Sequence, residues 1–198
     1  MVVTVVFFYA GLVMNFYAGT YAMEEASGSV TDIILSNTRT YDVDGLFVYG
    51  SYALFLFILF LTLRKLNQMP FIGQTIALFV MIRSLFITLT HVGPFPTQIA
   101  IDSNLLSRVS FGGDLFFSGH TGLPFLMALI FWDVLLLRYT FLTISIAFGI
   151  IVLLGHLHYS IDVVSAFFIT YGIFHIALKL FKKDYALFQD GIEPLQHS

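Results

Sequence analysis

Residues 140–181 read TFLTISIAFGIIVLLGHLHYSIDVVSAFFITYGIFHIALKLF, two long apolar runs that are joined by a short polar stretch. The runs, at 140–157 and 161–181, are close to the ~20 residues that a helix needs to cross a bilayer. Only His158, Tyr159 and Ser160 separate them, which leaves room for a tight turn. This stretch therefore predicts a helical hairpin in a membrane.

Outward from the hairpin, charges and turn-forming residues divide the chain into further apolar runs. These runs lie at 1–22, 46–63, 71–90 and 121–137. Of the 198 residues, 58% are hydrophobic and only 11% are charged, whereas a soluble domain is about 25% charged. The excess apolar surface has to face lipid. We expect an all-α polytopic membrane protein, a six-transmembrane-helix bundle formed by a single domain over 1–198, with a short polar tail at 182–198.

The first apolar run, residues 1–22, also has the length and composition of a secretory signal. A signal peptide begins with a basic region, which this run lacks, although AGTYAM at 18–23 offers the small residues that a signal peptidase accepts. We expect a retained first helix, with cleavage as the alternative.

Composition also bears on the classes of partner. A net charge of -3 argues against nucleic acid, which binds basic surfaces. The chain has no cysteine, so it has neither a disulfide framework nor a thiolate metal site.

The cations indicate how the six runs are oriented, because cytoplasmic loops are enriched in lysine and arginine. Only Arg39 and Arg108 lie in the loops of one side. The other side holds Arg64, Lys65, Arg138, Lys179, Lys182 and Lys183. We therefore expect cytoplasmic termini, with the loops at 23–45, 91–120 and 158–160 on the non-cytoplasmic face.

This topology brings two histidines to one face of the membrane. His120 opens the fourth run, and His158 lies between the fifth and the sixth. Asp162 follows His158 by four residues, which places both on one face of a helix. A carboxylate there can bind one imidazole nitrogen and leave the other as a nucleophile. The alternative is an interfacial histidine paired with an acid for solubility.

The tetrapeptide SGHT at 118–121 begins a helix, and helix N-termini favour bound anions. A phosphate there would accept hydrogen bonds from Ser118 and from backbone N–H groups, beginning at Gly119, while His120 protonates the departing oxygen. Otherwise Ser118 is only a helix cap and His120 only an interfacial residue.

Arg83 lies inside the third run, where a cation is costly and usually has a partner or a functional role. It is a candidate phosphate ligand or the partner of Asp114 in a structural salt bridge. Asp133, close to Arg138, is expected to be structural. His91 and His156 flank the same face as His120 and suggest zinc, but no HxxxH or carboxylate-rich spacing accompanies them. We expect no metal.

Two blocks, GGDLFFSGHT at 112–121 and LLGHLHYSIDVVSAFFITY at 153–171, resemble the catalytic motifs of the sphingomyelin synthase family, a branch of the type 2 phosphatidic acid phosphatase (PAP2) superfamily. Weaker similarities are RSLFITLTHVGPFP at 83–96 and SVTDIIL at 29–35. The matching positions are Gly113, Asp114, Ser118, Gly119, His120 and Thr121, then His156, His158, Tyr159, Ser160, Ile161, Asp162 and Val163.

The resemblance spans residues 30–175 and implies six membrane helices with a non-cytoplasmic active site. The chain departs from the family at Gly112, where many relatives have cysteine. Ile151 and Val152 stand where the ordinary phosphatase branch has Ser-Arg. This second difference favours head-group transfer over plain phosphatase activity.

By this resemblance, the protein moves a phospho-head group, such as phosphocholine, from a glycerophospholipid to a lipid alcohol such as ceramide. His158 would form a phosphohistidine, oriented by Asp162, and His120 would act as acid and then base. Arg83, Ser118, Gly119 and Asp114 would form the phosphate site, without a cofactor. Membrane phospholipids and the alcohol are the expected partners, and the oligomeric state is not indicated. The alternatives are a lipid phosphate phosphatase and a non-catalytic lipid-binding membrane protein.

Overall fold

A computed structural model describes residues 2–100 and 116–191, and the secondary structure in these ranges is helical, without strands. The helices are α1 (Val2–Glu24), α2 (Asp44–Arg64), α3 (Met69–Leu89), α5 (Gly119–Ile130), α6 (Leu135–Leu154), α7 (Ser160–Leu180) and α8 (Lys182–Asp190). Two short 3₁₀ turns are η1 (Leu35–Asn37) and η2 (Leu66–Gln68).

The long helices have the dimensions of membrane spans. Within the described ranges, α1, α2, α3, α6 and α7 are long and apolar enough to cross a bilayer, and α5 is a shorter apolar helix. Each long helix has at least 20 residues, and so covers the ~30 Å hydrocarbon core at ~1.5 Å per residue. The prediction of an all-α, polytopic membrane protein is confirmed.

The predicted boundary between the fourth and fifth spans is wrong. The run at 121–137 was expected to continue to a break at Arg138, but α5 ends at Ile130 and α6 already begins at Leu135. Phe131 lies in the turn between them and is buried against Phe141 and Phe188. In the sequence, an apolar residue that packs inside a turn looks the same as one inside a helix. A prediction from hydropathy alone therefore continues the fourth span through this turn.

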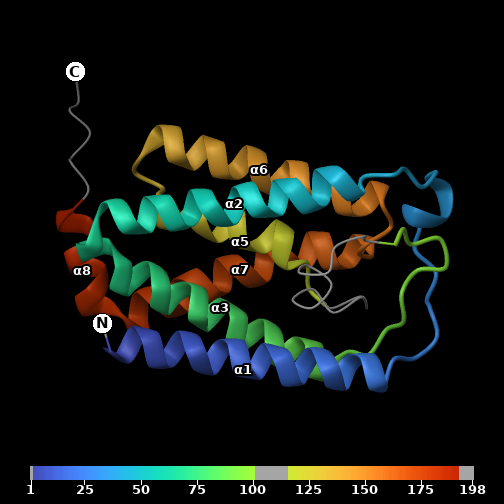
Figure 1. The fold of residues 1–198 in the computed structure, drawn as a ribbon, viewed down its shortest axis with the longest axis horizontal. Coiled ribbons are helices and arrows are strands. Elements are labelled where there is room, and N and C mark those ends of the chain that lie inside the picture. The colour runs from blue at the N-terminus through green and yellow to red at the C-terminus, as the bar shows by residue number, and fades with distance from the viewer. Residues whose placement is uncertain (1, 101–115, 192–198) are drawn as a thin grey trace.

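The helices run side by side along the long axis of the molecule (Figure 1). Helix α1 packs on α3, α3 also contacts α7, and α5 is enclosed by α3, α6 and α7. Helix α5 is closely packed at Gly122, where an added Cβ would lie 2.9 Å from the Phe79 ring and 2.9 Å from Thr170 Oγ1. The short helix α5 is therefore held deep in the bundle.

One end of the bundle, which we call the terminal end, carries the turns at 64–69 and 131–134 together with α8 (Figure 1). Helix α8 is anchored there by Phe188, which is 1% exposed and packs on Phe71. Lys65 donates a hydrogen bond to the carbonyl of Gly191 at 2.7 Å. The terminal end therefore gathers the six cations that the orientation prediction relied on.

The opposite end, the loop end, carries residues 25–43, 90–100 and 155–159, which bond to one another. Ser27 N–H donates to His91 O at 2.7 Å, and Ile99 N–H donates to Gly155 O at 3.1 Å. Tyr41 N–H donates to Leu154 O at 2.9 Å. Three segments far apart in sequence thus form one cap over the helix ends.

His156 lies inside this cap rather than facing a metal. Its φ is 53°, and it is 2% exposed. Its Nδ1 lies 2.6 Å from Thr97 Oγ1 and 3.1 Å from Thr40 Oγ1. Burial lowers the pKa of His156 below 6.5, against the opposing effects of a Thr38 backbone hydrogen bond and the Asp32 charge. The neutral imidazole therefore joins two loops.

Close packing at Gly122 predicts an unequal response of two glycines to alanine. Gly122→Ala should lower the free energy of unfolding by about 1–3 kcal/mol, because Phe79 and Thr170 are both buried and have little room to move. Gly172→Ala, in α7 with no described residue within 4 Å of its added Cβ, should be neutral or slightly stabilising. Equilibrium unfolding in mixed micelles would measure both, and equal effects would contradict this packing.

Burial of neutral His156 predicts acid sensitivity of the cap. Because its folded-state pKa is depressed, the stability it contributes is complete above the ordinary value of 6.5 and declines as pH falls below that value. His156→Asn tolerates the positive φ and does not titrate, so its melting temperature should fall less than that of the wild type between neutral pH and pH ~5.

The matched control for this variant is His175→Asn, because His175 is exposed on α7. Its melting temperature should follow the wild-type pH profile. Parallel profiles for wild type and His156→Asn would show that His156 does not link the cap to pH.

Candidate active site

The first turns of α5 and α7 meet near the loop end and carry the two predicted motifs (Figure 1). Ser118 is fully buried and caps α5, since its Oγ accepts from Thr121 N at 3.4 Å and from Thr121 Oγ1 at 3.1 Å. The N–H of Ser118 donates to the carbonyl of Asp162 at 3.2 Å. A backbone hydrogen bond therefore fixes one motif to the other.

His158 and Asp162 are adjacent, but not for the reason the spacing suggested. Helix α7 begins at Ser160 with Tyr159 as its N-cap, so His158 precedes the helix. Asp162 folds back, and its Oδ2 accepts from the N–H of Tyr159 at 2.9 Å. His158 Nδ1 lies 3.6 Å from that same oxygen, within ion-pair range and longer than a hydrogen bond. The first turn of α7, rather than one helix face, sets the pair.

The structure brings His120 to this pair. His120 is the second residue of α5, and its ring packs on Phe47 at 4.4 Å and on Phe148 at 5.7 Å between centroids. It interacts electrostatically with both His158 and Arg83. The four candidate groups on α3, α5 and the α7 turn therefore share one site.

Arg83 reaches from α3 to the start of α5. Its Nε donates to the carbonyl of Phe117 at 2.8 Å, and its Nη1 donates to Asn15 Oδ1 at 3.5 Å. A Cβ on Gly119 would lie 3.2 Å from Nε, so the absence of a side chain lets the guanidinium lie against the helix N-terminus. Asp114, the predicted salt-bridge partner or phosphate-site residue, lies outside the described residues.

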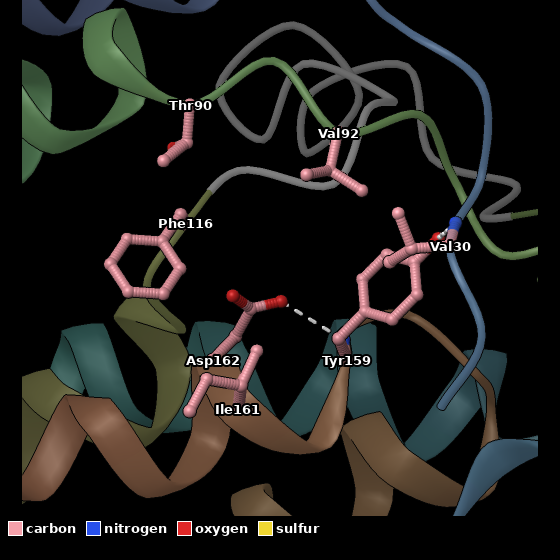
Figure 2. A pocket seen from close by; sticks show the side chains of 7 residues that line it. All are labelled: Val30, Thr90, Val92, Phe116, Tyr159, Ile161 and Asp162. Atoms are coloured by element: carbon pink, nitrogen blue, oxygen red, sulfur yellow. Dashed lines mark hydrogen bonds between the residues drawn. The ribbon is translucent and has the colours of Figure 1, made fainter. Parts of the chain in front are cut away.

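A pocket of about 210 Å³ opens beside Asp162 (Figure 2). Figure 2 shows the Asp162 carboxylate directed into it, between Phe116 and Tyr159. The remaining walls are mostly apolar and come from three loop segments and the start of α7; the lining residues are Val30, Thr90, Val92, Phe116, Tyr159, Ile161 and Asp162. The arrangement places one acidic group at a mostly apolar surface, as is typical of ligand-binding pockets.

Asp32 was missed as a site residue, although its loop was noted as a weak similarity. Its Oδ2 accepts from both N–H and Oγ of Ser160, each at 2.7 Å, and its Oδ1 accepts from Ile34 N and Leu35 N. Burial raises the pKa of Asp32, but these hydrogen bonds together outweigh burial and lower it below 3.8. No sequence signal connects residues 128 positions apart.

The other predicted polar residues lie away from the pair. His91 accepts from Ser27 through its carbonyl, and its ring meets Tyr21 edge-on at 5.0 Å. Asp133 is exposed in the turn before α6, where its charge adds to burial in raising the pKa of Tyr185. Within residues 2–100 and 116–191, no three histidine or acidic side chains are grouped to hold a metal.

Residues 112–179 match the family model described as PAP2 superfamily C-terminal. The matched segment contains both motifs and all the candidate residues except Arg83. Comparison with curated proteins and with solved structures gave no match. Members of the superfamily are typically phosphatases or phosphotransferases. Over residues 112–179, about a third of the chain, this protein is therefore similar to the C-terminal region of the PAP2 superfamily.

Proposed function

We propose that the protein is a lipid phosphotransferase of the sphingomyelin synthase type. It moves a phospho-head group, such as phosphocholine, from a glycerophospholipid to a lipid alcohol such as ceramide. The observation that carries this proposal is the placement of His158 beside Asp162, with His120 and Arg83 close enough for electrostatic interaction, in a bundle of membrane-spanning helices. The resemblance of both motifs to the synthase family favours transfer to an alcohol.

In the first displacement, His158 attacks the phosphorus of the donor lipid. Its Nδ1 is the nitrogen that faces Asp162, so Nε2 is the atom that forms the P–N bond. The P–O bond to the diacylglycerol oxygen breaks, and His120 donates the proton that this oxygen needs. The carboxylate of Asp162 stabilises the imidazolium character that His158 acquires.

In the second displacement, the hydroxyl oxygen of the acceptor attacks the phosphohistidine. A new P–O bond forms, the P–N bond breaks, and His120 takes the hydroxyl proton. His120 is thus ready to act as an acid in the next cycle, and the two steps balance without a cofactor. Water in place of the alcohol would give hydrolysis.

Negative charge on the phosphoryl oxygens increases in both transition states, and fixed donors stabilise such charge most effectively. Arg83 lies against Gly119, beside the backbone N–H groups that begin α5, and it interacts electrostatically with His120. Ser118 orders that helix start by capping it, and Asp114 belongs to the same sequence motif, four residues before Ser118. We assign these four residues to the phosphate site.

The orientation forms part of the proposal. With the cation-rich terminal end in the cytoplasm, the active site opens on the non-cytoplasmic face. Both substrates are membrane lipids, and the apolar pocket walls beside Asp162 suit them. A lipid phosphate phosphatase is the second candidate, since the PAP2 match is equally compatible with water as acceptor.

His158→Ala should abolish both turnover and covalent labelling. Purified wild-type protein incubated with glycerophospholipid that carries ³²P in its head group should acquire an acid-labile label, as a phosphohistidine does, whereas the variant should acquire none. Mass spectrometry of products, with and without ceramide, separates transfer from hydrolysis. His175→Ala, which removes an exposed α7 imidazole, serves as the matched control. Undiminished labelling of His158→Ala would exclude His158 as the nucleophile.

The loss of rate caused by His120→Ala should depend on the leaving group of the donor. With a lipid donor, the loss of the acid should slow head-group release about 10²- to 10⁴-fold. With a 4-nitrophenyl diester of the same head group, the phenolate leaves unprotonated, so release should slow by no more than about tenfold. A stopped-flow burst of nitrophenolate measures this step. Equal losses with both donors would show that His120 does not protonate the leaving oxygen.

A further inference from the structure

We propose that Asp32 is a positioning residue, which holds the turn between His158 and Asp162 in its reactive geometry. The inference rests on the proposed function. It assigns a role to the first loop, which lies far from the motifs in sequence and contributes no group to the two chemical steps.

The contacts of Asp32 are dense and divided between two segments. One carboxylate oxygen accepts from the backbone N–H and the hydroxyl of Ser160, each at 2.7 Å. The other accepts from Ile34 N at 2.8 Å and from Leu35 N at 3.0 Å. Asp32 is 7% exposed. The side chain therefore fastens the first turn of α7 to its own loop with little freedom on either side.

Ser160 is the residue through which this contact acts. It is the first residue of α7 and lies between the two members of the catalytic pair. The 3.6 Å separation of His158 and Asp162 depends on how the chain enters the helix, because His158 precedes the helix and Asp162 is inside it. A shift of Ser160 changes that separation directly.

Asp32 caps the N–H of Ser160, but it also accepts from the Ser160 hydroxyl, so helix capping is only part of its role. The N–H of Tyr159 already has an acceptor in Asp162, and this bond closes the turn from within. Asp32 adds an external attachment, and the Tyr159 hydroxyl adds a second one nearby, since it donates to Gly93 O at 2.9 Å and accepts from Val30 N at 3.1 Å. Val30 also lines the pocket. The same loop thus positions the turn and one wall of the pocket.

The test compares Asp32→Ala, Asp32→Asn, Ser160→Ala and the double variant Asp32→Ala/Ser160→Ala. Asp42→Ala is the matched control, because Asp42 is an exposed acid of the same loop whose carboxylate accepts from the nearby Asp44 N. Turnover of labelled donor lipid is normalised to folded protein by size exclusion. Hydrogen exchange of residues 158–163 gives a readout that does not depend on activity.

Asp32→Ala should lower kcat about 10- to 100-fold, as misplacement of reacting groups does, while KM stays within about twofold. Asp32→Asn keeps one acceptor and should retain an intermediate kcat. Ser160→Ala should lower kcat less than Asp32→Ala does. The kcat of the double variant should equal that of Asp32→Ala, because both changes break the same contact between Asp32 and Ser160. Exchange should rise at 158–163 in Asp32→Ala and not in Asp42→Ala.

Three outcomes would overturn the proposal. The first is a kcat per folded molecule in Asp32→Ala equal to that of Asp42→Ala, with only the melting temperature lowered. The second is additive losses in the double variant. If Asp32→Ala does not fold, unchanged kcat in both Asp32→Asn and Ser160→Ala would be the third. If the wild-type protein turns over no lipid, the proposed function is wrong. Hydrogen exchange at residues 158–163 then still tests whether Asp32 holds the turn.

Discussion

The start of α7 has to satisfy its backbone N–H groups inside a bundle that lipid surrounds, where an unpaired N–H is costly. Two carboxylates meet this need: Asp162 accepts from Tyr159 N, and Asp32 accepts from Ser160 N. The carbonyl of Asp162 in turn accepts from Ser118 N. One short turn thus determines where His158 lies, where α5 begins and how the first loop docks.

The rest of the site depends on how closely the helices approach this turn. Gly119 leaves room for the Arg83 guanidinium, and Gly122 brings α5 against α3 and α7. A larger residue at either position would separate the groups that share a charge environment, namely His120, His158 and Arg83. Close packing therefore brings charged groups from three separate elements together, as the proposed phosphoryl transfer requires.

Several features were predictable from local pattern. Apolar runs of spanning length identified the membrane helices, and the motifs at 112–121 and 153–171 agree with the PAP2 match. The end of the fourth span was wrong because Phe131 packs in a turn. The prediction that His158 and Asp162 lie on one face of a helix was also wrong, because α7 begins at Ser160, with Tyr159 as its N-cap, and His158 precedes it. Orientation and the roles of the site residues stay predictions.

The sequence by itself determined that the chain is a helical membrane protein, and it predicted the two histidines, Asp162 and the arginine of the candidate site. These follow from composition and short motifs, which depend only on neighbouring residues. Tertiary structure alone decided that Asp32 bonds to Ser160 and that His156 joins the threonines of two loops. Such contacts join segments whose separation in space is set by helix packing, and a hydrogen bond between them leaves no periodic trace in the chain.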